Sequence, residues 1–304
     1  MSFIADTGDA RQRLDLVLVR RLRGVSNVTR TQAQRWIRDG RVRVSGELRT
    51  RPSDGVAAGA RVEVDLPEGA RRTRPDAEAI ALDILYEDEW LIAINKPAGM
   101  VVHPTYKHAT GTLLGGVLWH LRGRPHTAPG IVSRLDKDTS GVLLVALTPV
   151  VHARIQRDAA AGRVRKEYLA VVRGTPRPPR GTITLPLARD PDDRRRVVAT
   201  ATGQRSETRY EVVSARGSMA LVRCELVTGR THQIRVHLSA SGWPIVGDRV
   251  YGEADAQMAR QALHAHRLRF THPVSGAAMD IAAPLPGDVE ELLAAETQRR
   301  KAQK

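Results

Sequence analysis

Apolar residues recur first at helical spacing and later at the spacing of strands. The helical pattern runs through residues 11–19 and again from about residue 29 to Gly40, where glycine favours an end to the helix. Polar and apolar residues then alternate in residues 41–47, with a turn at Ser45-Gly46, and again in residues 60–64. Such alternation is typical of half-buried strands. The pattern therefore predicts a small unit of two short helices, a hairpin and a further strand.

The rest of the chain mixes strand-like and helix-like runs. Apolar segments predict strands at residues 82–86, 90–95, 100–102 and 165–172, and helices at residues 112–121 and 150–161. Between the two regions, residues 67–80 begin with the Pro, Gly and charge content of a linker. We therefore expect a small unit at residues 11–66 and a larger unit at residues 81–297. Pattern and composition together predict an α+β protein with many strands.

A polar segment stands between two apolar ones in residues 130–146, and we expect the larger unit to be organised around it. Ile131-Val132 and residues 142–147 predict buried strands, so the polar segment is a loop held by two rigid elements. Such a loop can present a charged group to a substrate in a fixed geometry. Thr139 and Ser140 can close it through side-chain to backbone hydrogen bonds.

Asp136 is the candidate reactive group of this loop. Arg134 and Lys137 lie close to it in the sequence, so we expect its carboxylate to stay ionised and available as a nucleophile or base. Gly141 permits a backbone angle or a close approach that other residues resist. An ordinary turn between two strands is the alternative interpretation of the same residues.

The string Arg134-Leu135-Asp136-Lys137-Asp138-Thr139-Ser140-Gly141 resembles the active-site signature of the RluA family of pseudouridine synthases. The resemblance implies that Asp136 is the catalytic residue. It also implies that Arg134 fills the space left by a flipped nucleotide or binds a nearby phosphate. Ser133 departs from the pattern, because many members of the family carry His there. It lies outside the Arg-Leu-Asp core, so the departure affects the surrounding contacts more than the chemistry.

Two further segments carry the resemblance, one around Tyr168 and one around Arg235. From the pattern alone, Tyr168 is a core residue with a satisfied hydroxyl. Arg235 is either an exposed helix residue or one side of a two-pronged ion pair with a carboxylate from another segment. Thr231 can cap the helix that carries Arg235. By resemblance, Tyr168 sits against the target base and Arg235 is the basic partner of Asp136.

The chain carries a formal net charge of +15 and a sequence pI of about 10.9, which indicates a polyanionic partner such as nucleic acid. Residues 1–75 hold 16 Lys+Arg and 9 Asp+Glu, so a quarter of the chain has a net charge of +7. A cluster of arginines surrounds the second predicted helix: Arg30, Arg35, Arg38, Arg41 and Arg43. Such a face can contact phosphates. This unit resembles the αL RNA-binding domain; a small capping domain with a solvated basic face is the alternative.

Little in the sequence indicates metal, cofactor or disulfide chemistry. Cys224 is the only cysteine, so no internal disulfide can form. His264 and His266 stand two apart without a third ligand at convincing spacing. We find no phosphate-binding glycine loop, dinucleotide fingerprint or serine nucleophile signature. No signal peptide is evident and no apolar run reaches the length of about 18 residues that a membrane helix needs, so we expect a cytoplasmic protein.

The resemblance implies an isomerase that converts uridine to pseudouridine in structured RNA without metal or cofactor. Its implied fold is α+β: a mixed, mainly antiparallel sheet with flanking helices, preceded by the αL unit. The RluD-like arrangement favours large-subunit ribosomal RNA, with transfer RNA as the other candidate, and we expect a monomer. Arg230 is a further candidate RNA contact. Lys96 stands in a tight turn before Pro97, for which a structural role is the first interpretation and an RNA contact the second. The alternatives are a non-catalytic RNA-binding or ribosome-assembly factor, and a hydrolase that uses Asp136 with Asp138.

Overall fold

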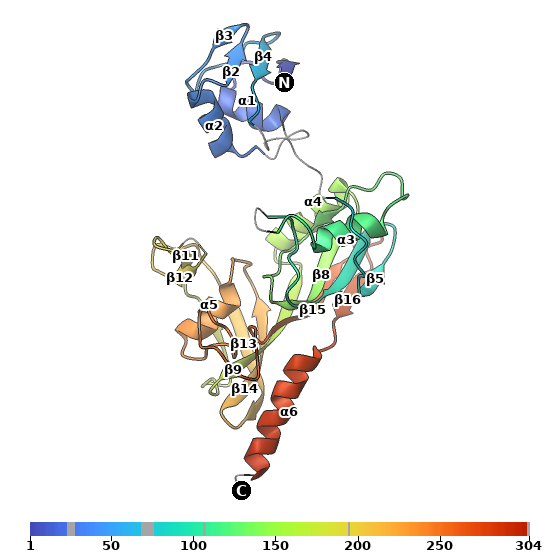
Figure 1. Cartoon of the computed structure of the whole chain (residues 1–304), viewed down its shortest axis with the longest axis vertical. Coiled ribbons are helices and arrows are strands. Elements are labelled where there is room, and N and C mark those ends of the chain that lie inside the picture. The colour runs from blue at the N-terminus through green and yellow to red at the C-terminus, as the bar shows by residue number, and fades with distance from the viewer. Residues whose placement is uncertain (23–27, 68–75, 106–107, 194, 303–304) are drawn as a thin grey trace. The chain divides into compact units, whose positions relative to one another are not determined.

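The structure is a computed structural model that describes residues 1–22, 28–67, 76–105, 108–193 and 195–302. It divides into two compact units, Met1–Arg74 and Pro75–Lys304 (Figure 1). Each unit has its own hydrophobic core. The predicted linker spans this division, and its residues 68–75 lie outside the described residues. Among the described helices, none has the length and apolar character needed to cross a membrane.

The N-terminal unit combines two helices with a small antiparallel sheet. The helices are α1 (Leu14–Arg21) and α2 (Arg30–Arg38), and the strands, in the order β1-β4-β2-β3, are Ser2–Ile4, Arg61–Val64, Val42–Val44 and Glu47–Leu48. Thr29 begins α2 with a capping box, in which Thr29 and Gln32 each bond the other's backbone N–H. Leu14 and Ile37 are fully buried in the shared core. The predicted helices and hairpin are confirmed, although α1 begins only after Arg13, whose backbone is extended.

The C-terminal unit is built on one ten-stranded sheet. Its order is β10-β13-β14-β9-β15-β8-β6-β5, with β16 paired to β15 and β7 paired to β8. The strands are β5 (Ile84–Glu87), β6 (Leu91–Lys96), β7 (Gly130–Ile131), β8 (Ser140–Ala146), β9 (Arg165–Arg173), β10 (Arg180–Ile183), β13 (Thr208–Arg216), β14 (Met219–Leu226), β15 (Leu263–Thr271) and β16 (Ala278–Ala282). The described pairs are antiparallel except β8 with β15, which is parallel. The prediction of a mixed, mainly antiparallel sheet is confirmed.

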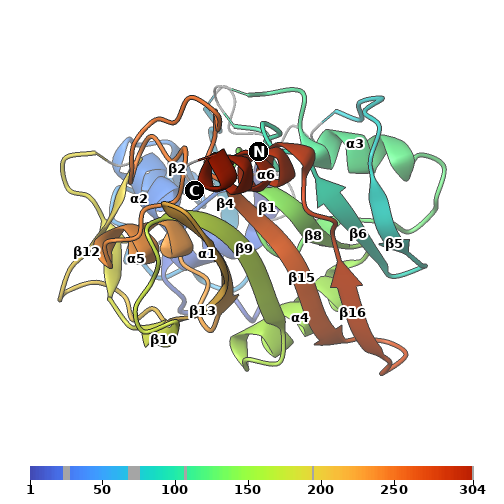
Figure 2. The same cartoon turned by 90° about the horizontal axis from the view of Figure 1, so that it is seen from below.

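Strand β15 lies between β9 and β8 and joins two halves of the sheet (Figure 2). The helices of the unit are α3 (Leu113–His120), α4 (Pro149–Ala160), α5 (Gln233–Ala240) and α6 (Gly287–Ala302). In the first half, Leu143 packs in the cluster that holds α3, whereas Leu144 packs in the cluster that holds α4. Because side chains alternate along a strand, these two helices cover opposite faces of β8. In the second half, α5 and α6 share one core with β9, β13 and β14.

Residues 100–102 do not form the strand that their apolar character predicts. Val101 makes only an isolated bridge to Thr112. The carbonyl oxygens of Val101 and Val102 instead accept hydrogen bonds from the backbone N–H groups of Leu113 and Leu114, at 2.9 and 3.1 Å. The first turn of a helix has N–H groups without an intrahelical partner, and this segment supplies their acceptors.

A small hairpin that the sequence did not predict lies beside α5. It consists of β11 (Leu187–Arg189) and β12 (Val197–Ala199), which pair antiparallel as a separate two-stranded sheet. Leu187 and Val197 pack against Val236 of α5 in a cluster of their own. The hairpin is therefore fixed on the helix that carries Arg235.

Candidate active site

The loop that carries Asp136 runs from β7 to β8, as its apolar flanks predict. Its backbone turns through a 3.1 Å hydrogen bond from the Thr139 N–H to the Asp136 carbonyl oxygen. The side chains of Thr139 and Ser140 do not close the loop, so that expectation is wrong. Ser140 Oγ lies 3.0 Å from His264 Nδ1, and Thr139 Oγ1 accepts from Gln261 Nε2 at 3.3 Å. Both side chains tie the loop to β15 and the residues that lead into it.

Gly141 brings β8 closer to β15 than a residue with a side chain could. Its φ is +109°, and a Cβ at this position would lie 2.2 Å from the carbonyl oxygen of Ala265. The two residues are partners in the parallel register of the strands. The predicted close approach at Gly141 is confirmed, and it fixes the end of the loop on the strand that joins the two halves.

Lys96 is fully buried beneath the loop and cannot contact RNA, so its prediction as an RNA contact is wrong. Its Nζ donates to the carbonyl oxygens of Pro97, Met100 and Lys137 at 2.7, 2.9 and 2.9 Å. An ammonium group has three donors, and these carbonyls use all of them. Burial lowers the pKa of Lys96 to about 8. Lys96 thus holds the backbone next to Asp136 in place.

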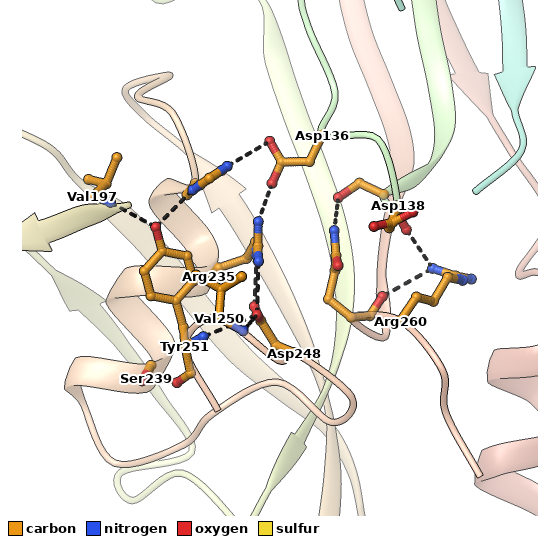
Figure 3. Close-up of polar contacts among 12 residues, drawn as sticks. Asp136, Asp138, Val197, Arg235, Ser239, Asp248, Val250, Tyr251 and Arg260 are labelled. Carbon is orange, nitrogen blue, oxygen red and sulfur yellow. Dashed lines mark hydrogen bonds and ion pairs between the residues drawn. The ribbon is translucent and has the colours of Figure 1, made fainter. Parts of the chain in front are cut away.

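Arg235 joins two carboxylates. Its Nη1 donates to Asp136 Oδ2 at 3.0 Å, while Nε and Nη2 donate to the two oxygens of Asp248 at 2.7 and 2.8 Å (Figure 3). The two-pronged pair therefore forms with Asp248, and the bond to Asp136 is single. Both Arg235 and Asp248 are buried, whereas the Asp136 side chain is 26% exposed. Burial alone would raise the pKa of Asp248, and the hydrogen bonds from Arg235 hold it below its usual value.

Tyr251 and His232 complete the surroundings of Asp136. The guanidinium carbon of Arg235 lies 4.9 Å from the ring centroid of Tyr251, a cation–π contact. Tyr251 Oη accepts from the backbone N–H of Val197 at 2.8 Å and lies 2.8 Å from His232 Nδ1. His232 Nε2 lies 3.8 Å from Asp136 Oδ1. The second oxygen of Asp136 thus faces an imidazole nitrogen.

Thr231 does not cap α5, so that expectation is also wrong. His232 occupies the N-cap position in the left-handed conformation, with φ +55°, and no side chain caps the helix. The left-handed region is uncommon for a residue other than glycine and costs about 1 kcal/mol. The unusual backbone directs the imidazole of His232 toward Tyr251 and Asp136.

Sequence reasoning assigned no role to His232, Asp248 or Tyr251. His232 stands within the segment already singled out around Arg235, so its position next to a candidate helix was the available signal. Asp248 and Tyr251 belong to a loop with no distinctive pattern, and their contribution depends on folding.

Tyr168 lies on β9 with its side chain buried in the core and also lines the cavity above Asp136. A place in the core and a place beside a bound base are therefore both possible for Tyr168. Burial raises the pKa of Tyr168, and the nearby charge of Asp136 raises it further. The residue accordingly enters any reaction as a phenol.

One cavity of about 590 Å³ brings together the candidate residues of the C-terminal unit, except Lys96. Asp136, Tyr168, Arg235, Arg134 and Arg230 line it. Its volume is within the range of about 300–1,000 Å³ typical of small-ligand sites. Asp138, by contrast, is not among the lining residues, so the cavity offers no paired carboxylates for a hydrolase.

Of the five arginines of the N-terminal unit that we predict to contact RNA, three pair with acidic residues of that unit. Arg30 pairs with the buried Asp15 at 3.1 Å, Arg35 with Asp39 at 3.6 Å, and Arg41 with Asp65 at 3.2 Å, while Arg43 donates to the carbonyl oxygen of Gly46. Arg38 is exposed. Arg30 therefore has a structural contact with Asp15, although its side chain is partly exposed. Arg38 is exposed and is well placed to contact a phosphate.

The remaining candidates for metal or thiol chemistry have structural surroundings. Cys224 is buried, and burial raises the pKa of its thiol to about 12. His264 contacts Ser140, and burial lowers its pKa to about 4, while His266 contacts the carbonyl oxygen of Ala283. Within the described residues, no group of three or more His, Cys, Asp or Glu could hold a metal ion.

Comparison with known proteins gives matches to both units. Residues 90–240 match the family model of RNA pseudouridylate synthase, and residues 12–62 match that of the S4 domain. A Bacillus subtilis protein named as an uncharacterized RNA pseudouridine synthase is 41% identical, covering 87% of this chain and 88% of its own. The ribosomal large subunit pseudouridine synthase D of Pseudomonas aeruginosa is 38% identical, covering 90% and 89%.

Solved structures agree with the sequence matches. The human RNA pseudouridylate synthase domain containing 4 aligns with a TM-score of 0.58 and 26% identity, covering 71% of this chain and 92% of that one. The human RNA pseudouridylate synthase domain containing 1 aligns with a TM-score of 0.57 and 26% identity, covering 72% and 96%.

Proposed function

The chain belongs to the RNA pseudouridylate synthase family, and we propose that it modifies large-subunit ribosomal RNA with Asp136 as the catalytic residue. As a member it is an isomerase that acts on RNA, and its S4 domain is an RNA-binding domain. The ribosomal substrate is supported by relatives that carry that substrate in their names and cover most of the chain.

The position of Asp136 is the observation that supports its role. Its carboxylate reaches the cavity while Oδ2 is bonded to Arg235, so Oδ1 is left facing the space where a nucleotide would lie. Arg235 is itself held by Asp248, which fixes the direction of the ion pair. A carboxylate held in this way needs little reorganisation when a substrate arrives.

Isomerisation of uridine breaks the bond from N1 to C1′ and forms one from C5 to C1′. The proton on C5 leaves and N1 gains one, so atoms and electrons balance without an external reactant. Asp136 either attacks the ribose or the base, or removes the 2′ proton to give a glycal. Tyr168 packs against the base in this scheme. Because Tyr168 is a phenol, it can pass on the C5 proton only by giving up its own at the same time.

The RNA must be opened at the target, because a stacked base cannot reach a cavity of this kind. Arg134 is exposed and lines the cavity, so it can fill the place of the extruded nucleotide or bind a phosphate beside it. Arg230 lines the same cavity. The basic face of the N-terminal unit would add phosphate contacts, which contribute affinity without reading the sequence.

The test is pseudouridine mapping of ribosomal and transfer RNA from cells with and without the gene, complemented by wild type, Asp136→Asn or Asp280→Asn. We expect specific large-subunit sites to disappear and to return with wild type and Asp280→Asn, but not with Asp136→Asn. Asp280 is a suitable control because it pairs with Arg267 on the surface of the sheet, outside the cavity lining. Return of the sites with Asp136→Asn would remove Asp136 from catalysis.

The same mapping separates the alternative functions. Loss of transfer RNA sites alone would replace the ribosomal substrate with transfer RNA. Loss of no site would favour a non-catalytic RNA-binding or ribosome-assembly factor.

A further inference from the structure

We propose that His232 is a substrate-contacting residue of this site, whose Nε2–H donates a hydrogen bond to the 2′-hydroxyl of the target uridine while Asp136 Oδ1 accepts one from it. The inference rests on the proposed function and adds a contact that selects the sugar. Its basis is the pair of polar atoms that face each other across the cavity, His232 Nε2 and Asp136 Oδ1, 3.8 Å apart.

The hydrogen-bond partners of His232 favour one tautomer. The backbone N–H of Val197 donates to Tyr251 Oη, which leaves the hydroxyl proton of Tyr251 to be donated elsewhere. Within the described residues, the acceptor recorded for that proton is His232 Nδ1, at 2.8 Å. An imidazole that accepts at Nδ1 carries its own proton on Nε2. In this tautomer the atom that faces Asp136 Oδ1 is an N–H donor.

His232 is held in this form by its surroundings. Burial lowers its pKa, and Arg235 lowers it further, whereas Asp136 and Asp248 raise it. The effects of the positive and negative neighbours on the pKa of His232 thus partly cancel, and burial favours the neutral ring. The left-handed backbone at His232 is a second independent feature, because such strain persists where the surrounding structure fixes a functional geometry.

The gap between the two atoms fits one hydroxyl group. A distance of 3.8 Å is too long for a direct hydrogen bond, but one oxygen can lie about 2.8 Å from both atoms. A group at that place must donate to Asp136 and accept from His232. Within an RNA chain the 3′ and 5′ oxygens are esterified and uracil carries no hydroxyl, so the 2′-hydroxyl is the group with this chemistry.

The edge of the base fits less well. Its N3–H and O4 could also offer one donor and one acceptor, but they are closer together than the two protein atoms. The base must in addition turn during the reaction, whereas the ribose stays attached to the chain. A rigid pair of polar atoms is better suited to the part of the substrate that does not move. The 2′-hydroxyl is also the group by which a protein distinguishes RNA from DNA.

The experiment compares the binding of two RNA fragments that contain a mapped site, one with uridine and one with 2′-deoxyuridine at the target. For wild type we expect the deoxy fragment to bind about fiftyfold more weakly, the equivalent of one charge-assisted hydrogen bond to Asp136 and one neutral hydrogen bond from His232. In His232→Asn the ratio should fall to about tenfold, because only the charge-assisted contact to Asp136 remains. Asparagine tolerates the left-handed backbone, so the fold is kept. Its side chain is shorter than that of histidine and does not reach the 2′-hydroxyl.

Two further variants test the role of the donor. His232→Gln places an amide N–H near the position of Nε2, and we expect it to recover part of the discrimination and of kcat. Tyr251→Phe keeps the ring beneath Arg235 but frees the imidazole to change tautomer, so the ratio should fall as in His232→Asn. An unchanged ratio in His232→Asn would overturn the inference. If blocking N3 by methylation of the target base abolished the effect of His232→Asn instead, the contact would be to the base.

Failure of this inference can be told from failure of the proposed function. Release of tritium from RNA labelled at C5 of uridine reports turnover by the wild type. If the wild type releases none from any RNA, the proposed function fails. If it turns over and the deoxy ratio does not respond to His232→Asn, only the contact to the 2′-hydroxyl fails.

Discussion

Substitution of Asp248 by Asn is the perturbation that most directly tests how the site is held. The change keeps the shape of the side chain but removes its charge and turns one acceptor into a donor that faces the guanidinium of Arg235. Arg235 and Asp248 are nearly inaccessible to solvent, so water cannot replace the lost partner. Arg235 would then be left with Asp136 as its only paired carboxylate among those described.

The expected size of the effect follows from the burial of the pair. Removing one partner of a buried ion pair costs about 3–5 kcal/mol, and the lower end applies because asparagine still accepts one hydrogen bond. We therefore expect the free energy of unfolding to fall by about 3 kcal/mol. A displacement of Arg235 near 1 Å would misplace Asp136, and errors of that size cost about a hundredfold in rate.

The assay measures urea unfolding by circular dichroism and kcat by tritium release, at a temperature where the variant is folded. Asp255→Asn is the matched control, since Asp255 is a nearly buried carboxylate paired with Arg173 and does not line the cavity. The control should lose stability and keep its kcat. If Asp248→Asn kept kcat within twofold of wild type, Asp248 would not position the catalytic pair.

Three further predictions concern Lys96 beneath the loop, the close approach of Gly141 to β15, and the basic face of the N-terminal unit. Above a pH of about 8 Lys96 loses a proton and one of its carbonyl partners loses a donor, so kcat should fall as pH rises through that value. Stability should not fall with it: the folded pKa is below the unfolded value of 10.5, so between the two the unfolded chain binds more protons and folding is favoured as pH rises. Gly141→Ala should lower the free energy of unfolding by about 3 kcal/mol, because its Cβ meets the carbonyl of Ala265, while Gly99→Ala, with positive φ but open space, should cost about 1 kcal/mol. Arg38→Gln should reduce the slope of log affinity against log salt by about one without shifting the urea midpoint, and an unchanged slope would exclude Arg38 as a phosphate contact.

Short-range patterns predicted the elements that carry the site. The loop around Asp136 and the helix around Arg235 follow from apolar spacing over a few residues, and their pairing came from the family resemblance. The structure places the two side chains together although 99 residues separate them. The local sequence thus identified the loop and the helix, and the family resemblance supplied the pairing of Asp136 with Arg235.

The predictions for Lys96 and Ser140 failed because their partners are distant in the sequence. Lys96 is buried because the carbonyl of Lys137, 41 residues away, lies above it, and nothing near Lys96 reveals that neighbour. The side chain of Ser140 contacts His264, 124 residues further along the chain, and not the backbone of its own turn. Asp248, which the sequence did not indicate, accepts two hydrogen bonds from Arg235 because the loop after α5 returns to that helix. In these cases a polar group has a partner that is set by chain topology, whereas the cap expected of Thr231 failed within its own segment.

The late place of β15 in the sequence has a consequence for synthesis on the ribosome. Asp136 belongs to the half of the sheet made first, and Tyr168 and Arg235 belong to the half made next. The strand that hydrogen-bonds both halves begins only at Leu263. A nascent chain could therefore complete its RNA-binding unit and fold each half before its catalytic groups meet. The newly made protein would therefore bind RNA before it could modify uridine. A chain truncated before β15 would bind RNA without modifying it.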